Sequence, residues 1–140
     1  MSQQANIAAT QRLGEAVNSG NLDVLHEVFA PNVIDRDPGS DQLPGPEGFI
    51  QFFTGFRAAF PDLSIGVEQM VADDDNIAIA YTITGTHQGD FLGIPATGRP
   101  IKARGVQIAR FEHGQIVERW GSSDQLGILQ QLGVNPIAAT

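Results

Sequence analysis

The first half of the chain carries apolar residues at helical spacing. The pattern predicts helices over residues 6–18, over residues 22–29 and from Pro46 to Phe60, with Pro31 ending the second. Phenylalanines in the third helix recur at positions that share one face. This stripe predicts a helix packed against a sheet, and it can also form one wall of an apolar pocket. Its members are Phe49, Phe52, Phe53, Phe56 and Phe60.

From Leu63 onward the apolar period changes to two residues, which indicates strands. We expect strands over residues 63–72, 77–87, 101–111 and 115–123, and a short one over residues 32–37. A last helix begins at Ser123 or Asp124 and ends at Gly133. Helices followed by a run of antiparallel strands predict an α+β domain, and the length predicts one domain over residues 1–140.

His113-Gly114 predicts a two-residue turn between the last two strands. That turn sets Gln107 opposite Trp120 and Ala103 opposite Asp124, all on one face. A one-residue bulge would exchange the two faces of the strand. The expected face therefore holds the single tryptophan, an amide and two acids (Glu118 and Asp124), beside small residues that leave space. Arg119 is expected on the other face.

Asp124 allows two interpretations. It is the N-cap of the last helix, a common position for aspartate. Alternatively it ends a strand beside Trp120 in a cavity, where desolvation raises a carboxylate pKa toward that of a general base.

His87 also allows two interpretations. It ends a strand whose face carries Tyr81, and a single histidine on an apolar face is usually a buried core residue. It also borders a glycine-rich segment, where a neutral imidazole can hydrogen-bond a substrate.

The composition of the chain excludes some classes of binding partner. The formal net charge is −8, which argues against nucleic acid and anionic membrane surfaces. The chain has no cysteine, lacks a signal-peptide pattern at residues 1–17, and has no apolar run of membrane-spanning length. We expect a cytoplasmic protein that meets small molecules or proteins. No nucleotide, cofactor or metal motif occurs, so we expect no cofactor and no metal.

Several motifs together resemble the SnoaL-like polyketide cyclase (ester cyclase) family of the NTF2-like superfamily. They are NSGNLDVLHEVFAPNVIDRDP, GPEGFIQFFTGFRAAFPDL, GTHQGDFLGIPATGRPI and GVQIARFEHGQIVERWGSSDQLGILQQLG. The resemblance implies a cone, in which a curved antiparallel sheet wraps about three N-terminal helices and encloses an apolar cavity, with a short C-terminal helix. It also implies a homodimer or homotetramer formed through the sheet.

The resemblance further implies cofactor-free aldol cyclisation of a polyketide ester, with Asp124 as the acid/base and His87 and Gln107 as hydrogen-bonding partners. The small apolar or aromatic ligand would contact residues around the cavity. Many relatives carry His-Asp-Pro where this chain has Arg36-Asp37-Pro38, a departure that concerns substrate identity. The expected ligand contacts are Trp120, Asp37, Arg36, Tyr81, Phe53, Phe56 and Phe91.

Two other functions are compatible with the same residues. One is a different small-molecule enzyme on this fold, such as an isomerase, a hydrolase or a hydroxylase. The other is a non-catalytic module for ligand binding or assembly.

Overall fold

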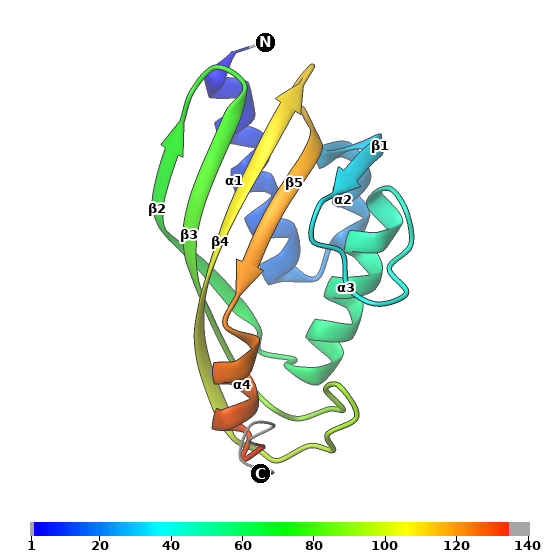
Figure 1. Cartoon of the computed structure of the whole chain (residues 1–140), viewed down its shortest axis with the longest axis vertical. Coiled ribbons are helices and arrows are strands. Elements are labelled where there is room, and N and C mark those ends of the chain that lie inside the picture. Colours follow the sequence, from blue (N-terminus) through cyan, green and yellow to red (C-terminus); the bar gives the residue numbers. More distant parts are fainter. Residues whose placement is uncertain (1, 135–140) are drawn as a thin grey trace.

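A curved five-stranded sheet forms the body of the molecule, and three helices cover one of its faces (Figure 1). The computed structural model describes residues 2–134. The helices are α1 (Gln3–Ser19), α2 (Leu25–Val28), α3 (Pro46–Ala59) and α4 (Gln125–Gln131), with a short 3₁₀ turn at Leu22–Val24. The strands are β1 (Phe29–Asp35), β2 (Ser64–Ala72), β3 (Asn76–Thr86), β4 (Pro100–Glu112) and β5 (Gln115–Ser123). The expected α+β architecture is confirmed.

Local chemistry accounts for the ends of α1 and α3. The Ser2 hydroxyl accepts the N–H of Ala5, and Gly20 closes α1 at a φ of 83°, in the left-handed region that favours glycine. Pro46 occupies the first turn of α3, where a missing N–H costs nothing. Each helix then turns its apolar side toward the sheet. In α3 this side is the phenylalanine stripe, and Phe49 stacks on Phe29 with ring centroids 4.1 Å apart.

The strand order is β1-β5-β4-β3-β2. β2 to β5 pair antiparallel, as the sequence predicts, but β1 runs parallel to β5. The antiparallel sheet implied by the family resemblance is therefore correct for β2 to β5 and wrong for β1. The difference arises because no hairpin links β1 to β5, so no turn dictates their relative direction.

The predicted register of the last hairpin is wrong beyond its first pairs. The two-residue turn is present, with Glu112 opposite Gln115. A bulge then leaves Val117 without a partner, and from Arg110↔Glu118 onward every pair is shifted by one residue. The faces of β5 are therefore exchanged. Gln107 lies opposite Gly121, and Trp120 lies opposite Ile108 on the outer face of the sheet.

A second bulge acts on β2. The register with β3 shifts between Val67 and Gln69, so Val71 no longer shares a face with Ile65. Val71 is instead 62% exposed on the outer face. The continuous alternation read from the sequence is thus interrupted once in each of these two strands.

The packing predicts a large difference between two phenylalanines of the same stripe. Phe60 is fully buried, whereas Phe52 is 48% exposed. We expect Phe60→Ala to lower the free energy of unfolding by about 3–5 kcal/mol, because it leaves a cavity among packed rings. Phe52→Ala should cost less than half as much. Urea denaturation of both variants measures this, and equal losses would contradict the packing described here.

Candidate active site

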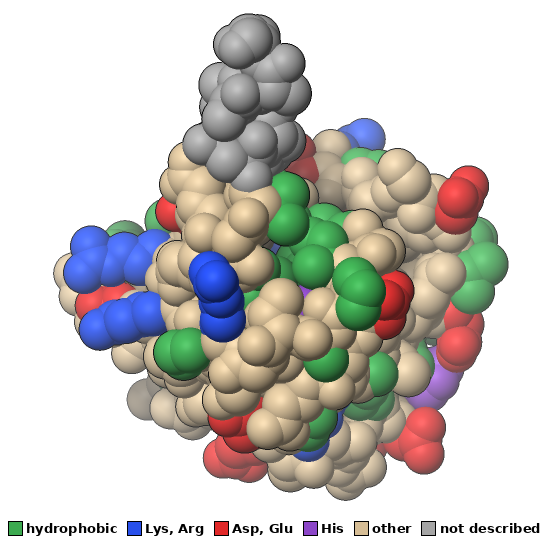
Figure 2. Space-filling view, turned by 90° about the horizontal axis from the view of Figure 1, so that it is seen from below, with side chains coloured by type: hydrophobic (Ala, Val, Ile, Leu, Met, Phe, Trp, Pro, Cys, Tyr) green, Lys and Arg blue, Asp and Glu red, His purple; other side chains and the backbone are tan. Residues whose placement is uncertain are grey.

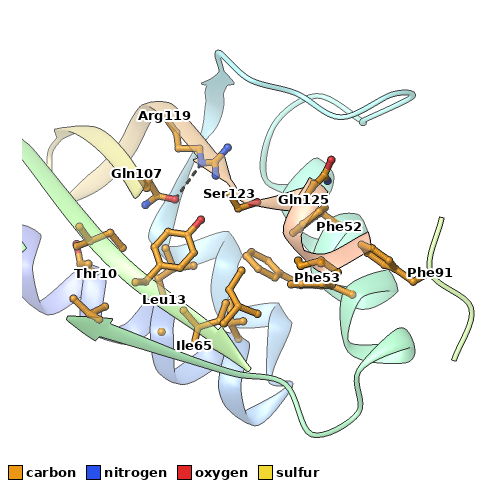
Figure 3. A pocket seen from close by; sticks show the side chains of 18 residues that line it. Thr10, Leu13, Phe52, Phe53, Ile65, Phe91, Gln107, Arg119, Ser123 and Gln125 are labelled. Atoms are coloured by element: carbon orange, nitrogen blue, oxygen red, sulfur yellow. Dashed lines mark hydrogen bonds between the residues drawn. The ribbon is translucent and has the colours of Figure 1, made fainter. Parts of the chain in front are cut away.

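A cavity lies between the inner face of the sheet and helices α1 and α3. Its volume is about 880 Å³, including the space at its open mouth. Figure 2 shows hydrophobic side chains gathered around a hollow at the lower end of the molecule. Figure 3 shows the side chains around the cavity, with Phe52, Phe53 and Phe91 at one end and the hydrogen-bonded pair Gln107 and Arg119 on one side toward the other end.

The aromatic end is built by α3 and by the segment between β3 and β4. Phe52, Phe53 and Phe56 project from α3, and Phe91 comes from the connecting segment. The Phe56 and Phe91 rings have centroids 5.9 Å apart, and those of Phe52 and Phe53 lie 5.1 Å apart edge to face. Such a wall suits a flat aromatic or polyketide-like ligand.

The polar end is organised by Arg119 of β5. Its Nη1 donates to Asp35 Oδ1 at 3.2 Å, and its Nε donates to Gln107 Oε1 at 3.1 Å (Figure 3). The Gln42 amide donates to Asp35 Oδ2 at 3.0 Å. Asp35 and Arg119 have only 8% and 18% of their side-chain surface exposed. A chain of partly buried polar groups therefore runs from the loop after β1 to the sheet.

A second hollow of about 950 Å³, also counted to its open edge, adjoins the polar end. It shares Phe53, Gln107 and Arg119 with the first cavity, and Asp35 and Asp37 lie on its other side. The apolar cavity and this more polar hollow are thus neighbours that share part of their lining.

Two glycines make room for the large polar side chains. A Cβ atom at Gly105 would overlap the Tyr81 ring, and one at Gly121 would overlap the Arg119 guanidinium. Tyr81 pairs with Gly105, and Gln107 with Gly121, across neighbouring strands. The Tyr81 ring therefore lies over Gly105, and the Arg119 guanidinium lies over Gly121, on the side of the sheet that faces the cavity.

Tyr81 is the ionisable hydroxyl group of the lining. Burial raises the pKa of its phenol, because the charged form is poorly solvated there, and the Arg119 cation opposes part of that rise. No residue within 2–134 hydrogen-bonds its hydroxyl. It can therefore donate a hydrogen bond to a ligand.

The structure brings several of the expected site residues together. Tyr81, Gln107, Phe53, Phe56 and Phe91 all line the cavity. Asp37 lines the adjoining hollow, and its Oδ2 accepts the N–H of Gly121 at 2.8 Å.

Asp124 lies at the end of β5, between Ser123 and Gln125, which both line the cavity. Its own side chain is exposed and caps α4, because Oδ1 accepts the N–H of Gly127 at 2.9 Å. A Cβ at Gly127 would overlap this carboxylate, so the glycine makes the cap sterically possible. The carboxylate is not part of the cavity lining in this conformation.

Three other expected residues lie away from the cavity. His87 is fully buried, and its Nδ1 accepts the N–H of Thr97 at 3.1 Å. Arg36 pairs with Glu118 at 2.6 Å, a contact that lowers the pKa of Glu118. Trp120 is on the outer face because of the bulge at Val117. None of these three residues lines the cavity or the adjoining hollow, and their expected contacts with a ligand stay predictions.

Arg119 and Asp35 were absent from the residues expected at the site. The hairpin parity placed Arg119 on the wrong face, and nothing local distinguishes Asp35 from Asp37. The sequence offered one indication: a one-residue bulge in the hairpin exchanges the two faces of β5, and such a bulge would place Arg119 on the cavity side.

Among residues 2–134, no group of three or more histidine, aspartate or glutamate side chains is arranged to hold a metal ion. No helix in the same part of the chain is long and apolar enough to cross a membrane.

Comparison with known proteins supplies the family. The sequence profile of the SnoaL-like polyketide cyclases matches residues 7–132. This chain belongs to that family. It is 29% identical to the aklanonic acid methyl ester cyclase DauD of Streptomyces sp. (strain C5), over 91% of this chain and 81% of DauD.

Solved structures agree with this assignment. IdmH of Streptomyces antibioticus, a proposed polyketide cyclase, is 34% identical, with a TM-score of 0.81 over 92% of this chain and 99% of IdmH. TsrD of Streptomyces laurentii is 26% identical, with a TM-score of 0.87 over 95% of this chain and 98% of TsrD. The NTF2-like fold expected from the sequence is therefore confirmed for this SnoaL-like protein.

The single tyrosine of this SnoaL-like protein gives a direct test of the site's electrostatics. The phenolate absorbance reports only Tyr81, and its titration midpoint should lie above about 10, the value for free tyrosine. Arg119→Gln should raise the midpoint further, because it removes the cation that favours the phenolate. The exposed Arg12→Gln should leave it unchanged. A lower midpoint in Arg119→Gln would contradict this arrangement.

Proposed function

We propose that this protein closes a ring in a polyketide ester by intramolecular aldol addition. The observation that carries the proposal is the cavity itself, whose aromatic wall faces a polar end built from Tyr81, Gln107 and Arg119. A flat polyketide is likewise divided into an apolar part and a polar part, since it has an apolar ring system and a row of carbonyl oxygens. Membership of the cyclase family supports the same reaction.

The reaction is an isomerisation. A base takes a proton from a carbon next to a carbonyl, the resulting enolate carbon adds to a second carbonyl carbon, and the new alkoxide takes a proton back. Neither atoms nor electrons are exchanged with another reactant. The protein needs to fold the substrate, move one proton and stabilise negative charge on oxygen.

Asp124 is our candidate for the acid/base. It matches the aspartate at this position of the family motif, and both of its chain neighbours line the cavity. Its Oδ1 is engaged in the helix cap, while Oδ2 makes no hydrogen bond to a residue within 2–134. Asp35 is the alternative candidate for the acid/base, because it lies next to the cavity. Both of its oxygens, however, already accept hydrogen bonds from Arg119, Gln42 or the Asp37 N–H.

The test uses a methyl ester of the kind named for the relatives. Purified protein is incubated with aklanonic acid methyl ester, and chromatography with mass detection follows a product of unchanged mass. We expect Asp124→Asn to lower turnover by about 10²–10⁴-fold while substrate binding persists. Asp75→Asn, at the exposed tip between β2 and β3, is the matched control and should retain full turnover.

Two results would count against this account. Full turnover by Asp124→Asn would remove Asp124 as the acid/base. Absence of any ring-closed product with the wild-type protein, from either the aklanonic or the nogalonic acid methyl ester, would remove this class of substrate.

The outer face of the sheet supports a second part of the proposal, association with a second copy. The paired residues Val71, Ala78, Ile108 and Trp120 form an apolar row across β2, β3, β4 and β5. Val71, Ile108 and Trp120 are 62%, 48% and 39% exposed. Apolar rows of this kind on a sheet commonly mark protein interfaces.

We expect the wild-type protein to sediment as a dimer or tetramer and Ile108→Glu to sediment as a monomer. Leu92→Glu is the control, because Leu92 is also exposed, at 65%, but lies on the segment between β3 and β4. A monomeric wild-type protein at micromolar concentration, or an unchanged assembly in Ile108→Glu, would contradict an interface through the sheet.

A further inference from the structure

Arg119 is a cation held rigidly at the wall of the cavity. Asp35 binds its Nη1, Gln107 binds its Nε, and the guanidinium lies across Gly121. Its Cζ atom also lies 6.0 Å from the centre of the Phe49 ring. Its Nη2 makes no hydrogen bond to any residue within 2–134. The Arg119 guanidinium is permanently charged and held in place, and its Nη2 remains free to donate a hydrogen bond to a ligand. Arg119 lines both hollows.

We infer that Arg119 binds the substrate oxygen that becomes negatively charged during ring closure, and that Asp35 is the positioning residue that fixes its guanidinium. The inference rests on the proposed cyclisation. The ligand class is an enolate or phenolate oxygen on a flat conjugated ring system. Arg119 would thus be a catalytic residue of this chain that the motif resemblance did not indicate.

The energetics favour arginine in this role. A hydrogen bond from a charged donor to an oxyanion is stronger than a neutral one, and exclusion of water strengthens it further. A single buried cation would be costly, but the Asp35 carboxylate compensates its charge and accepts the hydrogen bonds of Nη1. The pair is therefore oriented before the substrate arrives and needs no rearrangement when charge develops on the oxygen.

The same contacts set the orientation of Gln107. Its Oε1 accepts the hydrogen bond from Arg119 Nε, so its Nε2 amide is the group left to donate. The Tyr81 hydroxyl, which burial keeps protonated, is a third donor on the same wall. The oxygen that gains negative charge would therefore meet donors only.

The experiment measures oxyanion binding without turnover. The probe is 4-nitrophenol, whose ionised and neutral forms are distinguished by absorbance, and 4-nitroanisole is its neutral analogue. Dissociation constants are measured on either side of the probe's own pKa. The wild-type protein should bind the phenolate more tightly than the phenol. Arg119→Gln should weaken phenolate binding by about tenfold to a hundredfold and leave 4-nitroanisole binding unchanged.

Three further variants keep the test decisive. The double variant Asp35→Asn/Arg119→Gln replaces the buried ion pair by two amides, so it avoids an unpaired buried charge if Arg119→Gln folds poorly. It should lose the phenolate preference as well. Arg119→Lys keeps the charge but not the planar geometry and should retain part of the preference. Arg12→Gln, an exposed site on α1, should behave as wild type.

The outcomes separate the two proposals. A wild-type protein without preference for the phenolate, or a preference that survives both Arg119→Gln and the double variant, overturns the inference. Equal loss of phenolate and 4-nitroanisole binding also overturns it, because Arg119 would then only support the cavity. A preference that depends on Arg119, in a protein that cyclises no polyketide ester, supports the oxyanion site and contradicts the proposed function.

Discussion

The bulge at Val117 is the constraint on which the site depends. One residue without a partner in β5 turns Arg119 toward the cavity and Trp120 toward the outside. Without it, the inner face would carry a bulky indole where the ion pair with Asp35 now lies. The same residue also determines the outer face, since Trp120 then joins the apolar row proposed to bind a second copy. Both the proposed chemistry and the proposed assembly therefore depend on a single irregularity in the hairpin.

The site combines a polar end held by hydrogen bonds with an apolar end built from phenylalanine rings. Asp35, Arg119 and Gln107 constrain one another through hydrogen bonds, and Gly105 and Gly121 leave the space that their large neighbours occupy. The opposite wall consists of phenylalanine rings in edge or tilted contact, which restrict a ligand by shape alone. In the proposed reaction, the phenylalanine wall would hold the ring system and the polar end would bind the reacting oxygens.

The elements of the fold could be predicted because they follow local periodicity. The helix from Pro46, the hairpin turn at His113-Gly114 and the family motif all lie within short stretches of sequence. The residues that face the cavity were less predictable, because a bulge has no strong local signature and shifts every later residue. His87 illustrates a different limit. Its position beside a glycine-rich segment suggested a ligand, whereas the fold buries it and pairs its Nδ1 with Thr97.

In the proposed reaction, the cavity binds a conjugated polyketide ester with its reacting oxygen at Arg119. A crystal structure of the protein with a ring-closed polyketide methyl ester bound tests this most directly. We expect the rings to lie against Phe53 and Phe56 and a ligand oxygen to lie within about 3 Å of an Arg119 nitrogen. A ligand bound outside the cavity, or one whose oxygens all face away from Arg119, would contradict it.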